Sequence, residues 1–261
     1  WHDRDLLQFE LPNDGSISLT DVTAEMATLL VTGPKAPALL GDVSGAAMSH
    51  ADFAWLSHQP LLIAGISVKA IRVSFAGEAG WEIHCPMSDV AAVYDAIIEK
   101  GVAHQLGHFG MLALDSMRLE KGYRSWKSDL TSDYSMLESG LERWVNFGKA
   151  EFIGRERLLA EHQAGAKRQF VTLTVDDPED GEPFGEAVYL STVNVDGRAA
   201  GLVVSAGYGH RTRKSIAMAV LDKDTIFADA ELSITVLGRK RTAHLVDGGV
   251  LYDPDNARMK V

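Results

Sequence analysis

Short β-rich runs separated by turns fill the last third of the sequence, and they constrain the fold more than any other feature. From residue 168 onward the runs are QFVTLTV, AVYLSTVNV, AAGLVVS, SIAMAVL, ELSITVL and RTAHLV. Strands of this length and spacing are typical of small antiparallel barrels or sandwiches. We therefore predict a small antiparallel β-barrel over residues 166–261, with a domain boundary near residue 165.

Residues 1–165 mix helix and strand patterns, which makes the chain as a whole α+β. Strands are expected at residues 28–32, on both sides of a Gly65 turn within residues 60–77, and at residues 80–86. Helices are expected near residues 33–40, 90–101, 109–121 and 152–162. Ser88 is the expected cap of the second helix, and Gly122 is expected to stop the third.

Charge and cysteine content narrow the function classes. The formal net charge is -11 and the pI is about 5.2, so the surface repels phosphate backbones and no nucleic-acid partner is expected. Cys85 is the only cysteine, which suits a reducing compartment such as a bacterial cytoplasm or a mitochondrial matrix. No apolar run reaches membrane-spanning length and no signal peptide is visible, so no membrane partner is expected. The start at Trp1 resembles the middle of a helical segment, so we expect a piece of a longer protein.

Glu82 lies in the expected strand GWEIHCP. Strand alternation places Trp81, Ile83 and Cys85 on one side of this strand. Glu82 and His84 lie on the other side. A glutamate on a polar strand face is usually solvated. The alternation therefore leaves two interpretations open, namely a solvated glutamate or a carboxylate that contacts a ligand.

Arg118 shares a helix stripe with two apolar residues. Met111, Leu114 and Arg118 fall at i, i+3 and i+7. An arginine on an apolar face needs an anionic partner or a route to solvent. One interpretation is an internal ion pair with a nearby carboxylate. The other is that Arg118 points at a ligand anion or a polar ring.

A basic and aromatic cluster follows Arg118 in the segment MRLEKGYRSWKSD. It contains Lys121, Tyr123, Arg124, Trp126 and Lys127. Aromatic rings can stack on a flat heterocycle, and cations can bind carboxylates. A solvated charged loop is the alternative interpretation, because such runs are common on surfaces.

Three other motifs carry no assignment. His104 and His108 are spaced i, i+4, but Gly107 interrupts them and no third ligand is evident, so no metal site is predicted. GYGHRTRKS resembles a phosphate-binding loop, but Arg213 stands where such a loop needs glycine. No GxGxxG follows an expected strand, so no Rossmann-type site for FAD or a nicotinamide is predicted in this chain.

Several segments together resemble one family, the folate-binding aminomethyltransferase fold of the glycine cleavage T-protein. The resemblance rests on GEAGWEIHCP, ALDSMRLEKGYRSW and MLESGLERWVNFGKAEFIGRERL, in this order. Further segments are similar to the relatives fused to FAD oxidoreductases, the sarcosine and dimethylglycine dehydrogenases: HDRDLLQFELPNDGSISLTDVT, VTGPKAPALL, SAGYGHRTRKSIAMAVL and LYDPDNARMKV. The resemblance covers nearly the whole chain. It implies a partial, cloverleaf-like aminomethyltransferase fold followed by the barrel.

The resemblance also implies a tetrahydrofolate pocket with four residues of this chain. Glu82 matches the glutamate that holds the pterin, whose edge offers adjacent N–H donors to a carboxylate. Arg118 matches the arginine of the family's LRLE segment. Trp126 and Phe75 match two tyrosines that line the folate, and Phe75 keeps the ring but lacks the hydroxyl.

The catalytic residue stays unassigned. The family's aspartate near the folate N10 lies in a segment that we expect before Trp1. Asp3, Asp5 and Asp14 do not match its motif. The anionic polyglutamate tail of folate makes the basic residues of the cluster its candidate partners: Lys121, Arg124 and Lys127.

The function implied by the resemblance is the tetrahydrofolate-binding part of an N-methyl amine dehydrogenase or oxidase. An FAD domain, expected in the same polypeptide but outside this sequence, would oxidise sarcosine or dimethylglycine. The resulting iminium or formaldehyde would be captured as 5,10-methylenetetrahydrofolate, and this part alone is expected to be inactive. Two alternatives stay open. One is a stand-alone folate-dependent aminomethyl- or methyltransferase, and the other is a non-catalytic folate-binding module for assembly or regulation.

Overall fold

A computed structural model describes residues 2–178, 185–187, 189–226 and 230–261 of the chain. The helices and strands form two compact units. The sheet unit contains Trp1–Val73 and Ala79–Leu106, and the barrel unit contains Ser74–Glu78 and Gly107–Val261. The barrel unit therefore includes a short segment that interrupts the sheet unit in the sequence. The boundary near residue 165 stays a prediction.

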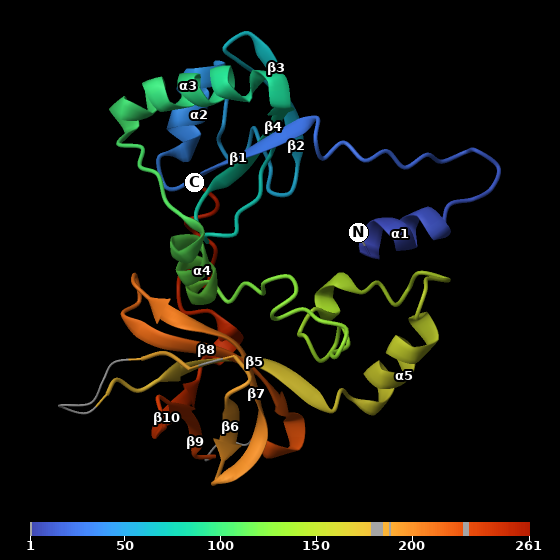
Figure 1. The fold of residues 1–261 in the computed structure, drawn as a ribbon, viewed down its shortest axis with the longest axis vertical. Helices are drawn as coiled ribbons and strands as arrows, with labels where there is room; N and C mark the ends of the chain where they lie inside the picture. Colours follow the sequence, from blue (N-terminus) through green and yellow to red (C-terminus); the bar gives the residue numbers. More distant parts are fainter. Residues whose placement is uncertain (1, 179–184, 188, 227–229) are drawn as a thin grey trace. The chain divides into compact units, whose positions relative to one another are not determined.

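Of the residues described, those of the sheet unit form a four-stranded antiparallel sheet. Its strand order is β1 (Met26–Thr32), β4 (Gly80–Pro86), β3 (Ile66–Ile71) and β2 (His58–Ile63). Helices α2 (Ala36–Ser44) and α3 (Val90–Gly101) pack against one face of this sheet (Figure 1). The short helix α1 (His2–Phe9) has no buried residue.

Strand β4 supplies the centre of the sheet unit's core. Its residues Trp81, Ile83 and Cys85 are all 0% exposed. Glu82 and His84 are only half-buried, because they lie on the opposite face of the strand. This burial pattern confirms the predicted alternation. Glu82 therefore lies on the face of the sheet opposite helices α2 and α3.

One helix start and one helix cap differ from the sequence predictions. Helix α2 begins at Ala36 instead of Gly33, since Lys35 is its N-cap and a proline lies in its first turn. Helix α3 follows a 3-10 turn over Met87–Asp89, so its N-cap is Asp89 and no side chain caps it. The prediction that Ser88 caps this helix is therefore wrong.

Among the residues described, the β-rich runs form a closed barrel of six antiparallel strands, which confirms the predicted barrel. The strand order is β10 (Arg239–Leu245), β5 (Arg168–Val175), β8 (Lys214–Asp222), β7 (Arg198–Gly209), β6 (Thr192–Val195) and β9 (Leu232–Val236). Helix α4 (Met111–Glu120) packs against β7 and β8, and α5 (Arg155–Ala164) precedes the barrel (Figure 1).

Strand β8 is buried on both faces. Its residues Ala217, Ala219 and Leu221 belong to the cluster inside the barrel. Its other residues contribute to a second cluster with Leu119 of α4: Ile216, Met218 and Val220. A strand buried on both sides reads as a continuous apolar run, as SIAMAVL does.

Gly122 ends helix α4, as predicted. Its φ of 72° lies in the left-handed region, where side chains are unfavourable. A Cβ at this position would also lie 2.4 Å from the carbonyl oxygen of Gly249. Both the backbone conformation and the close approach of the C-terminal segment therefore require glycine here.

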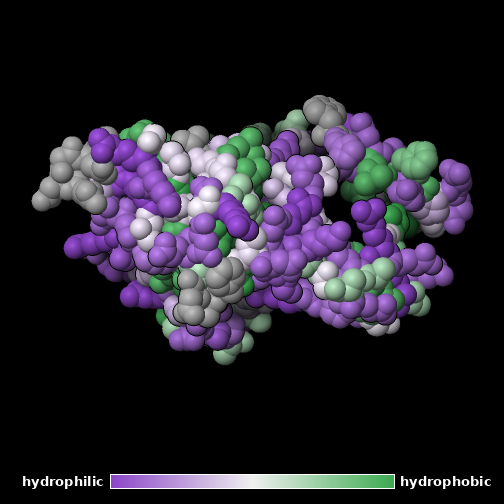
Figure 2. Space-filling model, turned by 90° about the horizontal axis from the view of Figure 1, so that it is seen from below, coloured by the Kyte–Doolittle hydropathy of each residue, from purple (hydrophilic) through white to green (hydrophobic). Residues whose placement is uncertain are grey.

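Hydrophilic residues cover most of the face shown in Figure 2, in keeping with the acidic composition. Within the described ranges, the structure contains no helix with the length and apolar content needed to cross a bilayer.

Candidate functional site

Glu82 belongs to a row of polar side chains in contact with one another, on the face of the sheet opposite helices α2 and α3. Its side chain is 42% exposed, and its Oε2 lies 3.2 Å from Nε2 of His84. His84 Nδ1 lies 3.0 Å from the hydroxyl of Thr28, which pairs with His84 across β1 and β4. Because a carboxylate only accepts hydrogen bonds, a neutral His84 must carry its proton on Nε2 and accept from Thr28 through Nδ1. One oxygen of Glu82 is thereby fixed, and no described residue bonds the other.

Phe75 lies in the short Ser74–Glu78 segment of the barrel unit and stacks on Tyr123. The ring centroids are 6.1 Å apart and the ring planes are inclined by 9°. The Tyr123 hydroxyl donates to the sulfur of Met259 at 3.2 Å. Burial raises the pKa of Tyr123 above its ordinary value, so its phenol is neutral at physiological pH. The two rings form a stack that a flat ligand ring can extend.

Arg118 is 3% exposed and makes internal contacts on all sides. Its Nε donates to Asp115 at 2.6 Å, and its Nη1 donates to Asp129 at 2.6 Å. Nη2 donates to the Ser205 hydroxyl at 2.9 Å. These are the contacts of an internal ion pair, one of the two interpretations that the sequence left open. A direct contact of Arg118 with a ligand stays a prediction.

Arg118 also connects to the aromatic stack. Its Nη1 donates to the carbonyl oxygen of Tyr123 at 3.2 Å, and Asp129 accepts from the backbone N–H of Ser125 at 2.7 Å. The buried ion pair therefore fixes the loop that follows α4. Trp126 lies in this loop and is 64% exposed.

The basic residues of this loop have different surroundings. Lys121 is buried, and its ammonium group donates to the carbonyl oxygen and the carboxylate of Asp253. Lys127 is exposed and adopts a φ of 71°. Arg124 is half-buried, with its guanidinium carbon 4.2 Å from the ring centroid of Phe170.

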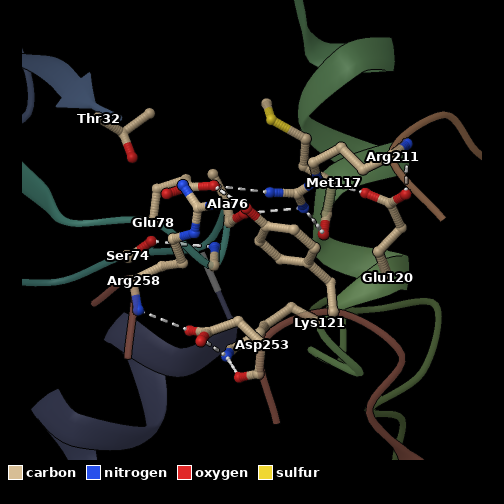
Figure 3. A network of polar contacts seen from close by, with 12 residues as sticks. Thr32, Ser74, Ala76, Glu78, Met117, Glu120, Lys121, Arg211, Asp253 and Arg258 are labelled. Carbon is tan, nitrogen blue, oxygen red and sulfur yellow. Dashed lines mark hydrogen bonds and ion pairs between the residues drawn. The ribbon is translucent and has the colours of Figure 1, made fainter. Parts of the chain in front are cut away.

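Arg211 is the centre of a network that the sequence did not predict (Figure 3). Its Nε donates to Glu120 at 2.5 Å, and its Nη2 donates to the carbonyl oxygens of Met117 and Ala76 at 3.0 and 3.1 Å. Its Nη1 lies 3.3 Å from the carboxylate of Glu78. The network ties the β7–β8 turn to α4 and to the Ser74–Glu78 segment. The sequence GYGHRTRKS, rejected as a phosphate loop, has this structural role.

Tyr252 completes the Arg211 network. Its hydroxyl donates to Glu78, and its ring centroid lies 3.7 Å from the guanidinium carbon of Arg211. Burial and the hydrogen bond to Glu78 both raise the pKa of Tyr252. The C-terminal segment is thus fixed to the same charged group as the Ser74–Glu78 segment.

The four predicted folate residues fall into both units. Phe75 and Arg118 belong to one neighbourhood of the barrel unit, because both contact Tyr123, and Trp126 lies in the same loop. Glu82 belongs to the sheet unit. A joint role for the four residues stays a prediction.

Residues that the sequence reasoning missed are mainly distant partners. Asp129 ends the segment MRLEKGYRSWKSD, and its carboxylate lies 11 residues after Arg118 in the sequence. Ser205 and Arg211 lie far from their partners in the sequence, and no local pattern marks them.

The histidine pair has an ordinary structural explanation. His104 contacts Asp42 through Nε2 at 2.7 Å, and His108 lies outside any helix. The part of the chain that the structure describes contains no group of three potential metal ligands.

Two family models match this chain over most of its length. Residues 1–149 match the model described as the GCVT N-terminal domain. Residues 168–253 match the glycine cleavage T-protein C-terminal barrel domain. These matches confirm the predicted resemblance.

Curated relatives include both dehydrogenases and aminomethyltransferases. The chain is 30% identical to human mitochondrial dimethylglycine dehydrogenase over 99% of its own length and 30% of that protein. It is 34% identical to mouse mitochondrial sarcosine dehydrogenase over 93% of its length and 26% of that protein. An aminomethyltransferase from Thermoanaerobacter pseudethanolicus is 27% identical over 88% of this chain and 61% of the relative. The chain thus spans less than a third of the dehydrogenases that it matches.

A solved structure has the same fold. The glycine cleavage system aminomethyltransferase T from Bartonella henselae matches with a TM-score of 0.70, at 22% sequence identity. The match covers 84% of this chain and 58% of that one. It confirms the predicted α+β aminomethyltransferase fold with a C-terminal barrel.

Proposed function

Because this chain belongs to the glycine cleavage T-protein family, we propose that it is the tetrahydrofolate-binding part of an N-methyl amine dehydrogenase or oxidase. The observation that carries this proposal is the match to dimethylglycine dehydrogenase along 99% of the chain. The amine, of the sarcosine or dimethylglycine type, would be oxidised by an FAD domain of the same polypeptide. The one-carbon unit would leave as 5,10-methylenetetrahydrofolate.

Glu82 is the proposed pterin anchor. A pterin edge presents adjacent N–H donors, and an ionised carboxylate can accept two hydrogen bonds side by side. His84 limits the rotation of the Glu82 carboxylate, while no described residue occupies its second oxygen. The donor set of the ligand and the acceptor set of the residue therefore fit each other.

Phe75 and Trp126 are the proposed flat contacts for the rings of the folate. Phe75 is already stacked on Tyr123, which restricts its rotation before a ligand binds. We assign Arg118 a positioning role, because its donors are engaged by Asp115, Asp129 and Ser205. Bound tetrahydrofolate would supply the two nitrogens that take up the one-carbon unit. The residues named here would orient the folate, which accelerates a reaction by proximity.

A stand-alone aminomethyltransferase is the second candidate function. It is favoured by the aminomethyltransferase relatives, of which the chain covers about twice the share that it covers of the dehydrogenases. A non-catalytic folate-binding module for assembly or regulation is a third candidate. The mass and absorbance spectrum of the intact polypeptide distinguish the first two, because only the dehydrogenase would carry flavin. A bacterial cytoplasm or a mitochondrial matrix is the proposed compartment, since the dehydrogenase relatives are named mitochondrial.

Calorimetric titration with 5-formyltetrahydrofolate tests the Glu82 assignment. Glu82→Gln should weaken binding by about 1–3 kcal/mol, since a charged hydrogen-bonding partner is replaced by a neutral one with a misplaced donor. Glu99→Gln is the matched control, because Glu99 is an exposed glutamate at the end of α3 in the same unit. Equal affinities of the two variants would remove Glu82 from the site. Absence of any binding by the unmodified protein would contradict the proposed function.

A further inference from the structure

Two arginines of the barrel unit carry charges that no described carboxylate neutralises by an ion pair. They are Arg124, in the loop after α4, and Arg143, in the 3-10 turn Glu142–Trp144. Neither makes a hydrogen bond or an ion pair with any described residue; both instead lie against aromatic rings. This contrasts with Arg118 and Arg211, whose charges are paired with buried acidic side chains. Arg118 and Arg211 thus each pair with a buried carboxylate, whereas Arg124 and Arg143 do not.

Arg124 is held in one place by its packing. Its guanidinium carbon lies 4.2 Å from the ring centroid of Phe170. A Cβ at Gly140 would lie 2.6 Å from its Nη2, so the absent side chain at Gly140 makes room for the guanidinium group. Its Nε is buried without a hydrogen-bond partner, whereas its two Nη atoms are not among the buried unpartnered atoms. The outer edge of a fixed guanidinium group is therefore open.

Gly140 lies against the guanidinium group of Arg124, and Arg143 follows Gly140 by three residues. Burial lowers the pKa of Arg124, the positive charge of Arg143 lowers it further, and Asp129 opposes this effect. Arg143 also lowers the pKa of Tyr123, against the larger effect of burial. The side chain of Arg143 is exposed, with its guanidinium carbon 5.1 Å from the ring centroid of Trp144. Arg124 directly follows Tyr123 in the chain, so the two arginines belong to the part of the barrel unit that contains the Phe75–Tyr123 stack.

A bound anion would reduce the repulsion between the positive charges of Arg124 and Arg143. Like charges at short range repel each other, and a carboxylate between two guanidinium groups accepts hydrogen bonds from both. Guanidinium groups suit this task because their planar donors match the two oxygens of a carboxylate. The neighbouring rings add a surface for an aromatic group that carries the anion.

We propose that Arg124 and Arg143 form an anion site for the carboxylates of a glutamate-bearing aromatic ligand, beside the Phe75–Tyr123 stack. This inference rests on the proposed function and names the part of the ligand that the arginines bind, the glutamate tail. Of the three cations that the sequence offered for this tail, Lys121 is engaged by Asp253. The structure retains Arg124 and adds Arg143, which lies in the segment MLESGLERWVNFGKAEFIGRERL but was not among the cations predicted for the tail.

The test uses a probe that lacks the pterin. The full chain is titrated with p-aminobenzoyl-triglutamate at low salt. Binding is followed by calorimetry and by tryptophan fluorescence, to which Trp144 beside Arg143 contributes. Arg143→Gln should raise the dissociation constant about tenfold or more, the usual effect of losing a charge-assisted hydrogen bond. Arg124→Lys keeps the charge but removes the planar donors, so it should also weaken binding. Added salt should weaken binding to the unmodified chain.

Matched controls separate the possible outcomes. Arg157→Gln removes an exposed arginine of α5 and should leave the affinity unchanged. Circular dichroism checks that each variant is folded. Equal affinity of Arg143→Gln and Arg157→Gln for the probe would overturn the inference. So would displacement of the probe by inorganic phosphate at the concentration at which free triglutamate displaces it, because the site would then lack preference for carboxylates.

The proposed function and this inference can fail separately. If 5-formyltetrahydrofolate binds through Glu82 but no arginine substitution changes the affinity for either ligand, the anion site is wrong and the proposed function stands. If the probe binds through the two arginines but 5-formyltetrahydrofolate binds no better than the probe, the anion site stands and the pterin assignment is wrong.

Discussion

Replacing Glu120 by glutamine should destabilise the barrel unit through a single buried contact. Glu120 is 0% exposed. Its Oε1 accepts from the backbone N–H groups of Arg211 and Thr212 at 2.7 and 2.8 Å, and its Oε2 accepts from Arg211 Nε at 2.5 Å. Glutamine can keep the first oxygen, but its amide then turns a donor toward Arg211 Nε. One charge-assisted hydrogen bond is lost and two donors face each other.

The expected loss is about 2–3 kcal/mol, within the range for a hydrogen bond to a charged group. It should stay below the cost of about 3–5 kcal/mol for breaking a buried ion pair completely, because Arg211 keeps other acceptors. These acceptors are Glu78 at 3.3 Å and the carbonyl oxygens of Ala76 and Met117. Urea denaturation followed by circular dichroism measures the change. With a slope of about 3 kcal/mol per molar urea, the midpoint should fall by about 1 M.

A double-mutant cycle tests whether the loss comes from the Glu120–Arg211 contact. Arg211→Met combined with Glu120→Gln should be less destabilising than the sum of the single changes, with a coupling energy above about 1 kcal/mol. Glu156→Gln, an exposed glutamate of α5, serves as the control and should stay within about 0.5 kcal/mol of the unmodified chain. Additive effects, or a loss as small as the control's, would refute this account of the network.

Two further predictions concern backbone strain and alkaline stability. Gly122→Ala should lower the free energy of unfolding, measured by urea denaturation, by more than about 1 kcal/mol. Gly197→Ala should cost less. Both glycines have positive φ, but only at Gly122 would the added Cβ also approach the carbonyl oxygen of Gly249. Burial and the hydrogen bond to Glu78 raise the pKa of Tyr252 above 10.0, so the folded state favours the protonated phenol. That stabilisation is complete below the ordinary pKa and is lost as the pH rises through the raised one. As the pH rises above about 10, Tyr252→Phe should therefore lose less unfolding free energy than the unmodified chain.

Patterns with a short period were the part of the fold that the sequence could predict. The alternation around Trp81 depends only on whether neighbouring side chains face the core or solvent, and the structure reproduces it. The barrel runs are predictable for the same reason, since strand length and turn residues are local properties. The residues of α3 were predicted correctly, but its cap was not, because a 3-10 turn over Met87–Asp89 precedes the helix and no residue type marks that turn.

The surroundings of the site residues depended on distant partners. Helical spacing placed Arg118 on an apolar stripe, but it could not distinguish an ion pair from a ligand contact. Which of the two contacts Arg118 makes depends on Asp129 and Ser205, and Ser205 lies 87 residues away on β7. Arg211 illustrates the same limit, because its carboxylate partner Glu120 lies 91 residues earlier. Such pairs are set by the packing of α4 on the barrel, which local patterns do not encode.

The short segment Ser74–Glu78 determines how this protein can be divided. It lies in the sequence between β3 and β4 of the sheet unit, yet it supplies Phe75 to the aromatic stack and Glu78 to the Arg211 network of the barrel unit. If the Ser74–Glu78 segment were supplied as a separate peptide, it would bind the barrel unit more weakly, because the covalent connection that gives it a high effective concentration would be missing. The two units are therefore not interchangeable modules. Recombination between related genes at a single crossover after Leu106 would exchange most of the barrel unit but leave its Ser74–Glu78 segment behind.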